Sequence, residues 1–167
     1  MPVIHDFEGF GRELGEIFER VRGEKDGAVA TYIPQLARVN PDAYGAAVCT
    51  IDGQRWSVGD SAVEFTAQST MKPINYCIAV EELGGDIVHE TIGREPSGRG
   101  FNFLTLNHDN RPHNPMINAG AIATCSLIKQ GSSVADRFDH VTEYWRRLAG
   151  NAKPGFSNTV YLSEKDK

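Results

Sequence analysis

Long uncharged hydrophobic runs are missing from this sequence of 167 residues. A helix that spans a membrane needs roughly 20 consecutive apolar residues, and no stretch comes near that length. Residues 1–6 also lack the basic flank and apolar block of a secretory signal, and the arginine and serine richness of a transit peptide. We therefore expect a cytoplasmic protein with no membrane partner, or a mitochondrial one if a leader has been removed.

Clustered positive charge is scarce as well. The chain has 17 lysines and arginines against 22 aspartates and glutamates, which gives a net charge of -5. Binding to nucleic acid requires a basic surface that neutralises phosphates, so we expect no nucleic-acid partner. Hydrophobic residues make up 40% of the sequence and charged residues 23%, which is typical of a globular protein. The length suits one domain, since domains commonly hold roughly 100 to 150 residues.

Metal-binding patterns are not found either. The three cysteines are odd in number, widely spaced and set among apolar neighbours, so we expect buried, reduced thiols; they are Cys49, Cys77 and Cys125. The five histidines show no ligand spacing such as H-E-x-x-H. The sequence therefore gives poor support to a metal-dependent hydrolase, and we expect no metal site.

Hydrophobic periodicity and turn signals predict a mixed α and β fold. A helix with Asp6 as N-cap, a hairpin turning at Asp52-Gly53 and a helix capped by Ser133 are the clearest elements. Phe156 to Leu162 reads as extended, with a new helix beginning at Ser163. The predicted helices cover residues 7–21, 69–83, 86–92, 115–131 and 134–148, and the predicted strands cover 44–51 and 54–58.

A serine and a lysine three residues apart give the most informative motif, Ser69-Thr70-Met71-Lys72-Pro73. Residues at this spacing share one face of a helix. A hydroxyl next to an amine that can take its proton is the minimal equipment of a Ser-Lys acyl-transfer enzyme. Pro73 is tolerated only in the first helical turn, so Ser69 should open a helix whose free N–H groups could hold an oxyanion.

The spacing alone is weak evidence, because Ser126 and Lys129 repeat the same S-x-x-K pattern. Ser126 falls inside an apolar helical run, where backbone donors are already used. We expect its hydroxyl to bond the preceding turn. Local context therefore favours Ser69 and Lys72 as the catalytic pair.

Between these two motifs lies a turn-rich excursion over residues 94–115, and loops of this length in compact domains are usually functional. Asn114 and Pro115 should begin the next helix, which is apolar on nearly every face and so should be buried. Asn118 is its polar exception. A buried amide needs hydrogen-bond partners, and Asn118 could either tie down a loop or bind a polar ligand.

Several ordered blocks together resemble the β-lactamase-like, serine-dependent glutaminases, most closely the kidney-type branch. The resemblance covers nearly all residues from about 28 onward, and several blocks in order are far more specific than S-x-x-K alone. The blocks are Tyr32-Ile33-Pro34-Gln35-Leu36, Gln68-Ser69-Thr70-Met71-Lys72-Pro73, Glu95-Pro96-Ser97-Gly98, Phe101-Asn102, His113-Asn114-Pro115-Met116-Ile117-Asn118-Ala119-Gly120-Ala121-Ile122 and Ser163-Glu164.

The resemblance implies an α/β (α+β) fold of the serine β-lactamase and DD-peptidase type, with a helical cluster packed with an antiparallel sheet. It implies hydrolysis of L-glutamine to L-glutamate and ammonia through a serine acyl-enzyme, without a cofactor, in a homo-oligomer. The nucleophile maps to Ser69 and the base to Lys72. The substrate-binding residues map to Tyr32, Gln68, Asn118 and Glu164.

The residue types suit a zwitterionic substrate, whose ammonium needs an acceptor such as Glu164 and whose polar atoms need neutral donors such as Tyr32 and Asn118. Lys72 must be neutral to act as a base, so its pKa must lie well below the usual value of about 10.4. Simpler roles exist for each residue: a surface lysine, a core tyrosine, a loop-anchoring Gln68 and a Glu164 placed at a helix start by the dipole.

The family's domain continues beyond the Ser163-Glu164 block and supplies further groups, among them a backbone donor of the oxyanion hole. We therefore interpret residues 1–167 as the N-terminal portion of a glutaminase catalytic domain, with little or no turnover on its own. Two alternatives stay open: a penicillin-interactive Ser-Lys acyl hydrolase, and a non-catalytic fragment that serves only in assembly.

Overall fold

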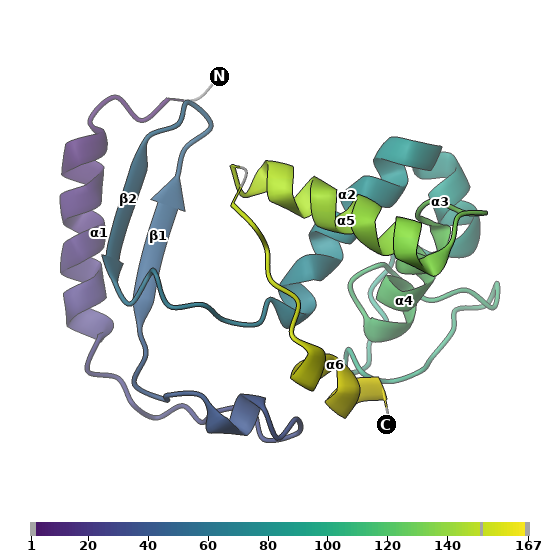
Figure 1. Cartoon of the computed structure of the whole chain (residues 1–167), viewed down its shortest axis with the longest axis horizontal. Helices are drawn as coiled ribbons and strands as arrows, with labels where there is room; N and C mark the ends of the chain where they lie inside the picture. The colour runs from purple at the N-terminus through teal and green to yellow at the C-terminus, as the bar shows by residue number, and fades with distance from the viewer. Residues whose placement is uncertain (1–2, 151, 166–167) are drawn as a thin grey trace. The chain divides into compact units, whose positions relative to one another are not determined.

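The computed structural model describes residues 3–150 and 152–165, which form two compact units (Figure 1). Unit 1 takes in the described residues of 1–66 and 157–167, and unit 2 those of 67–156. Unit 1 contains α1 (Phe7–Val21), the 3-10 turn η1 (Leu36–Arg38), β1 (Gly45–Cys49), β2 (Arg55–Gly59) and α6 (Asn158–Lys165). Unit 2 contains the 3-10 turn η2 (Gln68–Thr70), α2 (Met71–Leu83), α3 (Gly85–Thr91), α4 (Asn118–Leu127) and α5 (Val134–Leu148).

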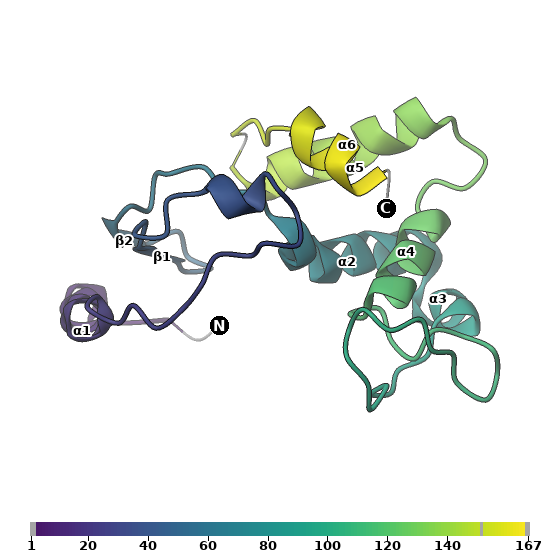
Figure 2. The same cartoon turned by 90° about the horizontal axis from the view of Figure 1, so that it is seen from below.

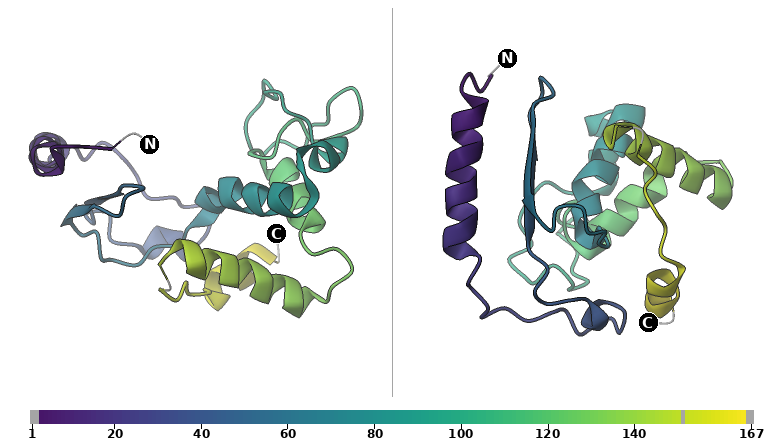
Figure 3. Two further views of the ribbon diagram at one scale, coloured as in Figure 1. Left: turned by 90° about the horizontal axis from the view of Figure 1, so that it is seen from above. Right: turned by 60° about the vertical axis from the view of Figure 1, so that its left-hand side comes forward.

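In unit 1, helix α1 lies along the hairpin of β1 and β2 (Figures 1 and 3). The Asp6 carboxylate accepts a hydrogen bond from the Gly9 N–H at 2.8 Å, so the predicted N-cap is confirmed. Gly11 allows the close approach, because a Cβ at this position would lie 2.7 Å from Cδ1 of Trp56 in β2. Phe18 is only 4% exposed and stacks on the ring of Tyr44, with 4.5 Å between the ring centroids.

The predicted hairpin is confirmed, although β1 is shorter than the strand predicted over 44–51 and β2 is shifted by one residue from the strand predicted over 54–58. β1 and β2 pair antiparallel, with Gly45 opposite Gly59 and Cys49 opposite Arg55. The turn is wider than two residues because the Thr50 N–H donates to the Gln54 carbonyl and the Gly53 N–H donates to the Thr50 carbonyl, each at 3.0 Å. Gly53 has a φ of 90°, which glycine adopts without steric cost.

In unit 2, helix α2 packs against α3, α4 and α5 (Figure 2). The C-terminal end of α4 is held by Arg137 of α5, whose guanidinium donates to the carbonyls of Cys125 at 2.5 Å and of the C-cap residue Ile128 at 2.9 Å. Ser133 caps α5 as predicted, since its hydroxyl accepts the Asp136 N–H at 3.1 Å. These helices enclose a small apolar core of Ile78, Ala79, Val88, Ile92, Leu127 and Ile128.

The helix predicted over 115–131 is shorter in the structure. The side-chain oxygen of Asn114 accepts the N–H groups of Met116 at 3.0 Å and Ile117 at 3.2 Å. Asn114 thus closes a separate turn, and α4 begins only at Asn118. The expectation that this helix is buried on nearly every face is wrong, because Ile122 is 72% exposed.

The extended segment predicted over 156–162 is also wrong, because most of it belongs to α6. The Ser157 hydroxyl accepts the Val160 N–H at 3.4 Å, and the helix begins at Asn158, five residues before Ser163. The three cysteines are free thiols, but they are exposed rather than buried. Among the described residues, no helix is both long and apolar enough to cross a membrane.

Candidate active site

Ser69 lies in the 3-10 turn η2, directly before α2, which matches its predicted place at a helix start. Its side chain is exposed. Pro73 occupies the first turn of α2, where a missing backbone N–H breaks no helical hydrogen bond. The sequence around Ser69 therefore folds into a turn that presents a hydroxyl at the beginning of a helix.

The residue before Ser69 has an unusual backbone conformation. Gln68 has a φ of 46°, in the left-handed region that residues other than glycine rarely adopt. The turn is closed around it by Thr70, whose N–H and hydroxyl both donate to the Ala67 carbonyl, at 3.0 Å and 2.5 Å. Strain of this kind is characteristic of functional sites, and Gln68 directly precedes the candidate nucleophile Ser69.

Lys72 and Asn118 meet between α2 and α4. The Nζ of Lys72 donates a hydrogen bond to the side-chain oxygen of Asn118 at 2.6 Å. Partial burial lowers the pKa of the Lys72 ammonium below its usual range, because burial disfavours the charged form. Asn118 is exposed, so the expectation of a buried amide is wrong. The hydrogen bond described for Lys72 is to Asn118 and not to Ser69.

The ring of Phe101 covers the same lysine. The Nζ of Lys72 lies 5.5 Å from the ring centroid, within the range of a cation–π contact. The backbone carbonyl of Phe101 also accepts the Asn118 N–H at 2.9 Å. The Phe101-Asn102 block was recognised in the sequence without a role, and hydrophobic periodicity gives no signal for a contact between this loop and Lys72.

The loop over residues 94–115, which contains Phe101, is closed at its base. The Gly93 N–H donates to the Pro112 carbonyl at 2.8 Å, and the Glu95 N–H donates to the His113 carbonyl at 3.0 Å. A Cβ on Gly93 would lie 2.5 Å from the His113 carbonyl oxygen, so glycine permits this approach. The predicted long loop is therefore confirmed as an ordered segment whose two ends are joined.

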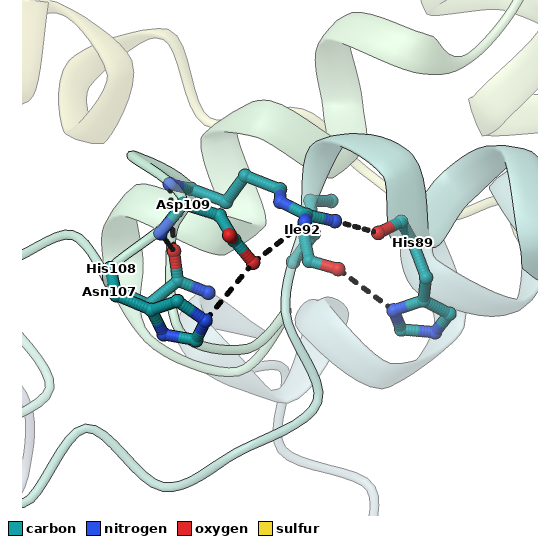
Figure 4. Close-up of polar contacts among 6 residues, drawn as sticks. His89, Ile92, Asn107, His108 and Asp109 are labelled. Carbon is teal, nitrogen blue, oxygen red and sulfur yellow. Dashed lines mark hydrogen bonds and ion pairs between the residues drawn. The ribbon is translucent and has the colours of Figure 1, made fainter.

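The far part of the loop is attached to α3 through Arg111. Its guanidinium donates to the His89 carbonyl at 2.8 Å and to the Asp109 carboxylate at 2.7 Å. Figure 4 shows these contacts together with the Asn107 side-chain oxygen, which accepts the N–H groups of Asp109 and Arg111, each at 3.0 Å. His89 in turn contacts the Tyr76 hydroxyl of α2 at 2.7 Å.

Tyr32 and Glu164 belong to unit 1, where two distant parts of the chain come together. Glu164 lies in α6, and its neighbour Ser163 donates a hydrogen bond to the Gln35 side-chain oxygen at 2.5 Å. Gln35 follows Tyr32 by three residues in the same family block. Unit 1 therefore brings the segments that carry Tyr32 and Glu164 side by side, while Gln68, Ser69, Lys72 and Asn118 belong to unit 2.

The second S-x-x-K pattern has a different structure. Ser126 lies in the last turn of α4, and its hydroxyl donates to the Ala123 carbonyl at 2.7 Å, as predicted. Lys129 lies beyond the end of α4 with a φ of 50°, so the two residues do not share a helix face. This geometry supports the choice of Ser69 and Lys72 over Ser126 and Lys129.

An open groove of about 440 Å³ lies elsewhere in unit 2 and is not lined by Ser69 or Lys72. Its hydrogen-bonding groups are largely occupied, because the Tyr76 hydroxyl contacts His89 and the Asn114 side chain serves the turn before α4. Within the described ranges, no group of histidine, cysteine and acidic side chains is placed to hold a metal ion. Ser69 and Lys72 therefore remain the candidate catalytic pair.

A serine in the turn before a helix, with a partly buried lysine three residues further on, is the arrangement expected of a Ser-Lys acyl-transfer site. Residues 27–167 match the family model described as glutaminase. The chain is 49% identical to the mouse "Glutaminase liver isoform, mitochondrial" over 98% of its own length, and 48% identical to the "Putative glutaminase 3" of Caenorhabditis elegans, also over 98%. A glutaminase of Corynebacterium efficiens is 47% identical over 90% of the chain. The chain belongs to the glutaminase family.

Solved structures agree with this assignment. A probable glutaminase superposes on 97% of the chain with a TM-score of 0.88 and 30% sequence identity, covering 52% of that protein. The native form of Mglu superposes on 93% with a TM-score of 0.84 and 36% identity, covering 38% of that protein, and the structure of Mglu in its glutamate form is equally similar. The predicted α+β, β-lactamase-like fold class is confirmed. The chain spans 27% of the mouse relative, 28% of the nematode relative and 34% of the bacterial relative.

Proposed function

We propose that the protein to which this chain belongs is a glutaminase that hydrolyses L-glutamine to L-glutamate and ammonia. The observation that supports this best is the contact between Lys72 and Asn118, because it joins residues of two separate family blocks at the start of the helix that follows Ser69. Membership in the glutaminase family and the similarity to Mglu in its glutamate form support the substrate.

In the proposed reaction, neutral Lys72 takes the proton of the Ser69 hydroxyl while the oxygen attacks the side-chain amide carbon of glutamine. The tetrahedral intermediate collapses, the C–N bond breaks, and ammonia leaves with a proton returned through Lys72. Water then hydrolyses the glutamyl ester, releasing glutamate and restoring the Ser69 hydroxyl. A base and a nucleophile often reach hydrogen-bonding distance only when substrate is bound.

Asn118 contributes by fixing the amine. A neutral amine has one lone pair, and its hydrogen bond to the Asn118 oxygen constrains the direction of that lone pair. Burial of Lys72 favours the neutral form that the reaction requires. The hydrogen bond to Asn118 and the partial burial of Lys72 thus both assist the proposed proton transfer from Ser69 to Lys72.

For substrate binding we propose Tyr32, Gln68, Asn118 and Glu164. Glu164 would accept from the substrate ammonium, and Tyr32 would donate to a substrate oxygen. The hydrogen bond between Gln35 and Ser163 supports their cooperation, since it holds their two segments together. We further propose that units 1 and 2 belong to one catalytic domain in a homo-oligomer, that residues 1–167 alone turn over little glutamine, and that the protein resides in the cytoplasm or in mitochondria.

The test compares two serine variants in the longest natural protein that contains this chain. Ammonia release from glutamine should fall by at least a thousandfold in Ser69→Ala, because loss of a nucleophile abolishes covalent catalysis. Ser126→Ala removes the other S-x-x-K serine and should retain near-normal turnover. Equal activity of both variants would refute Ser69 as the nucleophile. The 167-residue chain, run in parallel, should release little ammonia.

A further inference from the structure

We propose that Phe101 is a positioning residue of the reaction: its ring holds Lys72 and its backbone carbonyl holds Asn118, so that one loop residue sets the geometry of the pair. The inference rests on the proposed function, in which Lys72 is the base. It adds a residue to which none of the site assignments above gives a role in catalysis.

The three residues form a closed set of contacts. The Lys72 Nζ lies 5.5 Å from the Phe101 ring centroid and 2.6 Å from the Asn118 side-chain oxygen. The Asn118 N–H donates to the Phe101 carbonyl at 2.9 Å, which places the first residue of α4 against the loop. A shift of Phe101 would therefore displace both partners of the hydrogen bond on which the orientation of the lysine depends.

Burial in a core does not explain the position of this ring, because Phe101 is 61% exposed. Phe103 offers a direct comparison, since it lies in the same loop, is 55% exposed and makes no described contact with Lys72. The distinguishing feature of Phe101 is thus its place over the amine.

The loop is held firmly enough to fix the ring. Its base is closed by the hydrogen bonds of Gly93 and Glu95 to residues 112 and 113, and its far part is attached to α3 by Arg111. The turn at the ring itself is closed by the Phe103 N–H, which donates to the Gly100 carbonyl at 3.1 Å. These anchors lie on both sides of Phe101 in the chain.

The ring should also have an electrostatic effect on Lys72. The face of an aromatic ring stabilises a cation, so Phe101 opposes the effect of burial, which lowers the pKa of Lys72. No charged side chain of α2, α4 or the loop contributes to that shift. Removal of the ring with retention of an apolar side chain should lower the pKa of Lys72 further.

The experiment uses the full-length protein and four variants: Phe101→Leu, Phe101→Met, Phe101→Tyr and Phe103→Leu. Loss of the ring in Phe101→Leu or Phe101→Met should move the acidic limb of the kcat/KM profile down by about half a pH unit, which is the size of a cation–π contact at an exposed site. It should also lower kcat about tenfold, with KM changed less than threefold, because misplacing the base affects the chemical step. Phe101→Tyr keeps the ring and Phe103→Leu tests general effects of the loop, so both should behave like the wild type.

Two apolar replacements are tested so that one remains informative if the other misfolds. Thermal unfolding identifies a variant that has lost its fold. The inference is overturned if folded Phe101→Leu or Phe101→Met matches Phe103→Leu in both the limb and kcat. If the proposed function itself is wrong, the result is different: Ser69→Ala then keeps its turnover, whatever the Phe101 variants do.

Discussion

The Nζ of Lys72 lies 2.6 Å from the side-chain oxygen of Asn118, although the two residues are 46 positions apart in the chain. Packing of α2 against α4 produces this contact. Both residues stand at helix starts, so small changes in the turns that precede them alter the site more than changes further along the helices.

Replacement of Asn118 by aspartate should change the pH dependence of the reaction. The substitution keeps the shape of the side chain and places a negative charge next to Lys72. An opposite charge at this distance stabilises the ammonium and raises its pKa by about 1 to 3 units. Because only the neutral amine acts as the base, activity is lost as the pH falls through the pKa, and the acidic limb of the kcat/KM profile should move to higher pH.

Asn110→Asp is the matched control, since Asn110 is an exposed asparagine in the loop that connects α3 to α4. Its pH profile should overlay that of the wild type. An acidic limb in Asn118→Asp that stays at the wild-type pH, in an active and folded protein, would contradict the assignment of Lys72 as the base.

Substitutions of Gln68 test the strain before the nucleophile. A residue with a Cβ is less stable than glycine in the left-handed region by roughly 1 to 2 kcal/mol. Gln68→Gly should therefore have a free energy of unfolding about 1 kcal/mol higher than Gln68→Ala. Urea unfolding of the two variants in the same protein measures this difference without involving the amide group.

Ala67 provides the reverse control, because it has an ordinary φ of -63°. Ala67→Gly should lower the free energy of unfolding by about 0.5 to 1 kcal/mol. If glycine at position 68 is as destabilising as glycine at position 67, Gln68 is not strained in the folded protein.

Gly120 is expected to tolerate no side chain. A Cβ at this position in α4 would lie 1.8 Å from the Asn114 carbonyl oxygen, so either the helix or the turn before it must move. Gly120→Ala should lower the free energy of unfolding by about 1 to 3 kcal/mol, although alanine is intrinsically favoured in helices. Turnover should fall as well, because Asn118 lies in the first turn of α4.

Gly85→Ala is the control for this substitution. Gly85 begins α3, and a Cβ there would meet nothing within 4 Å. The free energy of unfolding should be unchanged or slightly higher. A Gly120→Ala protein that is as stable and as active as Gly85→Ala would show that the close approach of α4 to the Asn114 turn is unimportant.

Local signals in the sequence predicted much of the fold. The caps at Asp6 and Ser133 and the proline at position 73 fix helix starts through contacts within a few residues. The start of α4 was misplaced because Asn114 forms its own turn instead of capping the helix. The extended segment before Ser163 was wrong because the cap at Ser157 begins α6 earlier.

The candidate site, like the fold, was predictable in part from the sequence. Motif spacing and family resemblance indicated Ser69, Lys72 and Asn118, and two of these meet in the structure. The role of Phe101 was not predictable, since its ring reaches Lys72 only through the path of a loop that has no periodicity. The left-handed backbone conformation of Gln68 was not predictable either, because glycine or asparagine is the usual residue in that conformation.

The most direct test of the account is a search for the acyl-enzyme on Ser69. The full-length protein is mixed with glutamine, quenched in acid within one turnover, digested and analysed by peptide mass spectrometry. The account predicts a glutamyl ester on the peptide that contains Ser69, none on the peptide that contains Ser126, and none in the Ser69→Ala protein. Rapid turnover with a glutamyl ester on another residue, or with full activity in Ser69→Ala, would contradict it.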